Sequence, residues 1–128
     1  MLAILIAASI LGVMLFVSFV VLPVAFAKLP ENLAGIYVRK LFPLYHITLF
    51  VASQIAGLLA YTPHLKPIAF IAGIVFAVHF LFLTPAINHS TDSGNAQRFK
   101  FLHLLSVSLH LAVMVLYAFA IFVDACLF

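Results

Sequence analysis

The sequence predicts an all-α fold, a bundle of four transmembrane helices in which residues 1–128 form a single domain. Four stretches, at about residues 2–26, 41–61, 67–87 and 101–123, contain no Asp, Glu, Lys or Arg. Each is long enough to cross a bilayer core, which needs roughly 20 apolar residues. The chain is also 67% hydrophobic and only 7% charged, whereas soluble chains average about 25% charged residues. Membrane β-strands would alternate polar and apolar residues, which these stretches do not.

The segment that follows the first stretch, residues 27–40, carries signals for a helix of its own. Pro30 and Glu31 suit a helix start, where a missing N–H costs little and an acid favours the helix dipole. Three apolar or aromatic residues then recur at helical spacing: Leu33, Ile36 and Tyr37. We therefore predict a short amphipathic helix that lies on the membrane surface in this first loop.

The remaining connections are set by prolines and by one polar segment. Pro43 falls near the start of the second stretch, where proline is tolerated. The link 62–67 contains two prolines and predicts a tight antiparallel turn between the second and third stretches. Residues 88–100 are strongly polar and separate the third stretch from the fourth. The predicted topology is therefore four successive crossings.

The basic residues gather on one side of this predicted bundle. Five of the six lie in loops 27–40 and 88–100, namely Lys28, Arg39, Lys40, Arg98 and Lys100. The positive-inside rule then places both loops in the cytoplasm and both termini outside, in a multi-pass protein of the inner (plasma) membrane. This bias accounts for the basic residues through topology, so the predicted partner is the lipid bilayer and no nucleic acid is expected.

Polar residues inside a membrane are costly and call for partners within the bundle. The fourth stretch carries a polar line on one helical face: His103, Ser106, His110, Tyr117 and Asp124. The second stretch carries Tyr45, His46 and Ser53, and the third carries His79. At 1.5 Å rise per residue, His79 and His110 lie about 12–13 Å from the cytoplasmic boundary, His46 about 8 Å and His103 about 3 Å. These four histidines are the candidate site, whereas His64 and His89 are expected to be solvent-exposed.

Three interpretations of these histidines remain open. Imidazole is a ligand for iron, copper and zinc, so His79 and His110 could be axial ligands of haem b, or the four histidines could bind a transition metal. Histidine also titrates near neutral pH and can relay protons. The third interpretation is hydrogen bonding between helices, worth about 0.6 kcal/mol each on average.

The sequence contains no catalytic signature, such as a nucleophile elbow, a phosphate-binding loop, HExxH or a CxxC pair. We therefore predict no catalytic residues and favour a non-catalytic membrane protein. Its histidines would support a haem, metal or small-molecule site. The alternatives are an accessory subunit of a larger membrane complex, and a self-associated channel or proton path.

Two local motifs resemble a known family. Residues 39–45, RKLFPLY, enter the second stretch, and residues 99–103, FKFLH, enter the fourth and are followed by Ser106. With the four-span layout, they resemble the transmembrane-protein-205-like family, a membrane domain family of unknown function. The resemblance implies a four-helix membrane domain and points to Pro43, Tyr45, His103 and Ser106 as shared positions. At His110 the family tends to have asparagine, so His103 is the histidine that the resemblance supports.

Overall fold

The computed structural model describes residues 1–127, and all of the regular structure is helical. The elements are α1 (Leu2–Phe16), the π-helical segment η1 (Val17–Val21), α2 (Leu22–Lys28), α3 (Glu31–Leu59), α4 (Leu65–Val78), the π-helical segment η2 (His79–Leu83), α5 (Thr84–Asp92) and α6 (Ala96–Cys126). They join into four rods that are each long and apolar enough to cross a membrane, Leu2–Lys28, Glu31–Leu59, Leu65–Asp92 and Ala96–Cys126. The predicted fold class, all-α with four membrane-length helices, is confirmed.

The predicted separate interfacial helix in the first loop is wrong. Residues 31–40 are the first turns of α3, which runs on through Pro43 to Leu59. Only residues 29–30 separate α2 from α3, so no length of chain is left that could lie flat on the membrane. The helical spacing of Leu33, Ile36 and Tyr37 was real, but it belongs to the end of a spanning helix. The rods contain 27 to 31 residues, more than the roughly 20 that a bilayer core requires.

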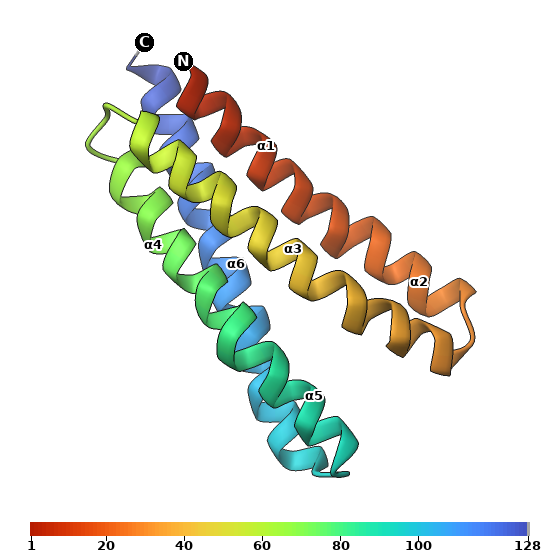
Figure 1. Ribbon diagram of the computed structural model, residues 1–128. Helices are drawn as coiled ribbons and strands as arrows, with labels where there is room; N and C mark the ends of the chain where they lie inside the picture. Colours follow the sequence, from red (N-terminus) through yellow and green to blue (C-terminus); the bar gives the residue numbers. More distant parts are fainter. Residues whose placement is uncertain (128) are drawn as a thin grey trace.

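The four rods form a bundle in which α3 and α6 stand at opposite corners. Helices α1 and α4 each pack against both α3 and α6. The chain termini lie at the same end of the bundle as the link 60–64 (Figure 1). At the other end, α2 and the start of α3 diverge from α5 and the start of α6 (Figure 1). The bundle is therefore closed at one end and spread at the other.

Both π-helical segments are explained by a proline that follows them. Segment η1 ends two residues before Pro23, and η2 ends two residues before Pro85. Proline lacks an N–H, and its ring clashes with the carbonyl four residues earlier, which falls inside the π-helical segment in both cases. A widened π turn relieves that clash without breaking the rod. The two halves of the chain thus share one order: helix, π segment, short helix with proline, long helix.

The turn between α5 and α6 is set by Gly94 and Asn95. Gly94 has φ of 70°, a left-handed conformation that glycine adopts without steric cost. The N–H of Gly94 bonds the carbonyl of Thr91 at 3.2 Å, and that of Asn95 bonds Ser90 at 3.0 Å, the Schellman pattern of helix ends. The Asn95 side chain then accepts the N–H of Arg98 at 3.1 Å, which caps the start of α6.

Small side chains let the rods approach closely, as is usual for helices packed in membranes. Ala7, Ala56, Ala69 and Ala120 are fully buried. Large apolar side chains point the other way, and Leu58, Val115 and Phe122 are about two-thirds exposed or more, at 71%, 67% and 71%. Alanines at the close helix contacts and large apolar side chains on the outer surface suit a bundle surrounded by lipid.

The close packing of the rods can be tested by substitution of Gly57. A Cβ at Gly57 would lie 3.0 Å from two ring carbons of Phe70 on α4, so Gly57→Ala should destabilise the bundle by about 1–3 kcal/mol through overpacking. Gly12→Ala is the matched control, because no described atom lies within 4 Å of its Cβ. Unfolding of the detergent-solubilised protein should show a loss for Gly57→Ala alone; equal midpoints for the two variants would refute the close contact.

Candidate functional site

Polar side chains of α3 and α6 meet across the centre of the bundle at two levels. Tyr45 and His110 share a hydrogen bond of 2.9 Å between the phenol oxygen and Nε2. Two turns along, Tyr117 donates to the hydroxyl of Ser53 at 2.7 Å. Because α3 and α6 stand at opposite corners, the long tyrosine side chains span the gap that the backbones leave.

A third polar contact closes the bundle at the end that holds the termini. Asp124 of α6 is fully buried and accepts hydrogen bonds from the hydroxyl of Thr62 and from Nδ1 of His64 at 3.1 Å. Thr62 also accepts the N–H of Leu65 at the start of α4, at 3.3 Å. One carboxylate thus ties the link 60–64 to the end of α6. His64, which was expected to be solvent-exposed, keeps 37% of its side chain exposed, but its Nδ1 is bonded to this acid.

Three histidines meet at the Tyr45 level, and we call His46, His79 and His110 the histidine group. The ring centroids of His46 and His79 are 4.8 Å apart, those of His79 and His110 6.3 Å, and those of His46 and His110 6.5 Å. They come from α3, from the first residue of η2 and from α6. His46 and His79 are buried, at 4% and 1% exposure.

His79 has carbonyl oxygens at both ring nitrogens. Nδ1 lies 2.8 Å from the carbonyl of Val75 in the preceding turn. Nε2 lies 3.2 Å from the carbonyl of Ser106 on α6. A neutral imidazole has one N–H donor, whereas the imidazolium has two. A neutral His79 can therefore satisfy one of these carbonyls, and a protonated His79 satisfies both.

His46, in contrast, has a ring nitrogen that lacks a hydrogen-bond partner within the described part of the chain. Its Nδ1 is buried and has no hydrogen-bond partner among residues 1–127. The ring stacks on Phe42 in the preceding turn at 5.6 Å between centroids. A buried nitrogen without a partner is unusual, because leaving such a group unpaired costs about 1–3 kcal/mol.

The predicted metal-type arrangement does not appear in the described part of the chain. Within residues 1–127, no group of three or more His, Cys, Asp or Glu side chains could hold a metal ion. The nitrogens of His79 face carbonyls, and Nε2 of His110 bonds Tyr45. The rings thus pack on one another rather than converge on a common point.

The other predicted site residues fall into two sets. Tyr45, Ser53 and Tyr117 are buried and take part in the contacts above. His103 is exposed, and its ring stacks on Phe99 at 5.5 Å between centroids. Ser106 contributes its backbone carbonyl to His79. The histidine that the family resemblance supported therefore stands apart from the histidine group, because the start of α6 has diverged from the first hairpin at that level (Figure 1).

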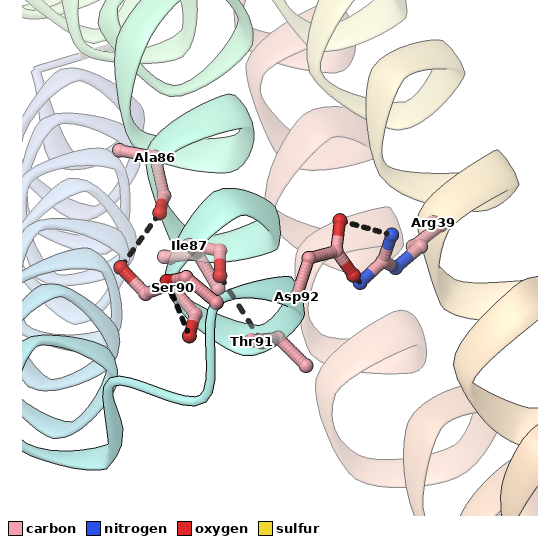
Figure 2. A network of polar contacts seen from close by, with 7 residues as sticks. Arg39, Ala86, Ile87, Ser90, Thr91 and Asp92 are labelled. Carbon is pink, nitrogen blue, oxygen red and sulfur yellow. Dashed lines mark hydrogen bonds and ion pairs between the residues drawn. The ribbon is translucent and has the colours of Figure 1, made fainter.

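An ion pair joins the two diverging hairpins. Arg39 of α3 donates to both carboxylate oxygens of Asp92 at the end of α5, at 2.5 Å and 3.1 Å, as Figure 2 shows. Beside it, Ser90 and Thr91 bond back to the carbonyls of Ala86 and Ile87, at 2.9 Å and 3.1 Å. The pair bridges the start of α3 and the end of α5, and both side chains are exposed, at 39% and 61%, where an ion pair contributes little to stability.

Sequence analysis missed both this pair and the Thr62–His64–Asp124 contact. The partners of the pair are 53 residues apart, and the acid lies 60 residues or more from its partners. One signal was available: Asp124 was the only acid on the polar line of the fourth stretch. A buried acid requires a donor, and His64 and Lys66 were the candidate cationic partners at the same predicted end.

Comparison with known proteins adds one finding. A family model described as a domain of unknown function, DUF4149, matches residues 5–66. The matched segment covers α1, η1, α2 and α3, and includes Tyr45, His46 and Ser53. No curated protein and no solved structure matches the chain, so no named relative connects it to the transmembrane-protein-205-like family.

The Tyr117–Ser53 contact can be tested by a double-mutant cycle. Both side chains are fully buried, so Tyr117→Phe and Ser53→Ala should each destabilise the bundle. Their coupling energy should be about 0.6 kcal/mol and at most about 1.7 kcal/mol, the range found for hydrogen bonds between membrane helices. Tyr61→Phe is the control, because Tyr61 is 96% exposed. Additive effects of the two core substitutions in detergent unfolding would argue against the bond.

Proposed function

We propose that this chain is a small, non-catalytic integral membrane protein that binds and releases a proton at the histidine group. The observation that carries the proposal is His79, whose two ring nitrogens each face a backbone carbonyl, at 2.8 Å and 3.2 Å. Charged groups inside membranes pair with one another or with backbone carbonyls. Val75 and Ser106 supply that pairing for a protonated His79, and its other neighbours are neutral rings.

A proton is favoured over haem b or a transition metal as the bound species. A ligand histidine must offer a free nitrogen lone pair to the metal, and both nitrogens of His79 are directed at carbonyl oxygens. A porphyrin between His79 and His110 would also have to displace the ring of His46, which lies 4.8 Å from His79. Either cofactor would therefore require the histidine group to open.

The same geometry argues for binding rather than for conduction through the bundle. The His110 and Tyr117 levels are seven residues apart on α6, a rise of about 10 Å. Proton transfer requires groups within hydrogen-bond reach. Phe76 and Met114 are buried, at 0% and 7% exposure, and together with the buried alanines they fill the core. The proposed proton is therefore bound at the histidine group and is not passed on to the Tyr117 level.

Nitrogen-15 NMR on histidine-labelled protein in lipid nanodiscs tests the proposal. On acidification, one intramembrane histidine should change from singly to doubly protonated, and that signal should be missing in His79→Gln. His103→Gln is the matched control and should keep the transition, because His103 lies outside the histidine group. If His46, His79 and His110 all stay singly protonated down to the pH at which the protein unfolds, the proposal fails. A Soret absorbance band, or a stoichiometric metal, would favour a cofactor instead.

A second candidate, membership of a larger membrane assembly, is supported by α6. No residue from Ala96 to Ala112 is buried, although this half of the helix carries His103 and Ser108. A neighbouring subunit or a second copy would give those polar side chains a partner. Cross-linking in native membranes through Ser108→Cys, with Leu58→Cys on α3 as the control, separates this candidate from a lone bundle.

The orientation of the bundle belongs to the same proposal. The spread end carries Lys28, Arg39, Lys40, Arg98 and Lys100. We infer from this bias that the spread end faces the cytoplasm, that both termini lie outside and that the membrane is the inner (plasma) membrane. The histidine group would then exchange protons with the cytoplasm. The two sequence motifs, 39–45 and 99–103, are the basis for proposing kinship with the transmembrane-protein-205-like family.

A further inference from the structure

An apolar groove lies in the first hairpin, between residues 20–29 of η1, α2 and the following turn and Tyr37 of α3. Its wall is formed by Val20, Val21, Val24 and Ala25, and Lys28 and Tyr37 also line it. Ala25 forms a buried floor at 6% exposure, whereas Val24 is 53% exposed. From Val20 to Lys28 the groove is about 12 Å long at the helical rise. Because Val20 and Val24 are 44% and 53% exposed on a rod long and apolar enough to cross a membrane, the groove is accessible to lipid.

The end of this groove is positively charged. Lys28 is exposed in the last turn of α2, and within residues 1–127 it forms no ion pair. Arg39, the next basic residue along the hairpin, is already bound to Asp92. Glu31 is the only acid in residues 1–59, and it does not line the groove. The ammonium of Lys28 is thus free to bind an anion.

Tyr37 places a hydroxyl at the same end. Its side chain is 41% exposed, and within the described residues its hydroxyl has no hydrogen-bond partner. Tyrosine is enriched where membrane meets water, with its ring among the chains and its hydroxyl among the headgroups. Lys28 is the last residue of the rod Leu2–Lys28, which places its ammonium at that level. An apolar groove that ends in an ammonium and a hydroxyl matches the two parts of a phospholipid.

We propose that the groove between α2 and α3 binds an anionic phospholipid. One acyl chain lies along Val20, Val21 and Val24, and the phosphate accepts hydrogen bonds from Lys28 and Tyr37. A headgroup with a net negative charge is preferred. A zwitterionic headgroup carries a cation of its own, which the ammonium of Lys28 would repel. This site is separate from the histidine group and does not depend on its protonation.

Native mass spectrometry of the full chain in detergent tests the site. The protein is incubated with equal amounts of phosphatidylglycerol and phosphatidylcholine that carry identical acyl chains. The unmodified protein should retain phosphatidylglycerol preferentially. Lys28→Gln should lower that retention about fivefold, the value of one lysine near an anionic headgroup. It should leave phosphatidylcholine unchanged, and Tyr37→Phe should give a smaller loss.

Lys66→Gln is the matched control, because Lys66 is an exposed lysine at the opposite end of the bundle. The proposal is overturned if Lys28→Gln and Lys66→Gln retain equal amounts of phosphatidylglycerol. It is also overturned if glycerol phosphate competes as well as the whole lipid, since a free phosphate would then suffice and the groove would have no part. Poor competition by glycerol phosphate supports the acyl-chain contact.

Discussion

The structure depends on one constraint: a polar side chain within hydrocarbon must find its partner inside the protein. Tyr45, Ser53, His79 and Tyr117 meet that constraint through contacts between different rods, and Asp124 meets it through the link 60–64. Each contact fixes how one helix is rotated relative to another. The apolar side chains could pack in several registers, but the hydrogen bonds allow few. The polar residues therefore specify the bundle, and the small residues around them let the helices come close enough to form it.

The polar contacts are distributed unevenly along the bundle. The end with the termini is closed by Asp124, and the centre by Tyr117 and Ser53. At the end away from the termini the two hairpins separate (Figure 1), and the exposed ion pair of Arg39 and Asp92 bridges them. Helix α6 has no buried residue before Val113. The bundle thus has a closed end and a spread end, and the histidine group is buried where the second, third and fourth rods pack together.

The sequence was sufficient to predict the number of crossings and which helix faces look inward. Charge-free stretches of the required length predicted the number of membrane-length helices. The helical spacing of His110, Tyr117 and Asp124 predicted the face of the fourth helix that points inward. It could not predict where α3 begins, because residues 31–40 have the same amphipathic spacing in a surface helix and in the end of a spanning one. The sequence also could not predict that the His103 side chain is exposed. Its exposure depends on how far the hairpins diverge, which is a property of the whole bundle.

The proline-linked π segments show a further limit of sequence reasoning. Pro23 and Pro85 predict a local disturbance, but not that it takes the form of a π segment or that His79 is the first residue of one. At that residue Nε2 of His79 lies 3.2 Å from the carbonyl of Ser106 on α6. Without this contact, His79 would be bonded only within its own rod. The contact between rods depends on the packing of the whole bundle, which the sequence of one stretch does not specify.

Paramagnetic broadening of the histidine ring signals by spin-labelled lipids tests the inward orientation most directly. In nanodiscs that contain lipids labelled along the acyl chain and at the headgroup, the structure predicts strong broadening for the exposed ring of His103. It predicts little for the rings of His46, His79 and His110, which face one another. Comparable broadening of all four rings would mean that the imidazoles point at the lipid, and it would contradict both the bundle and the site.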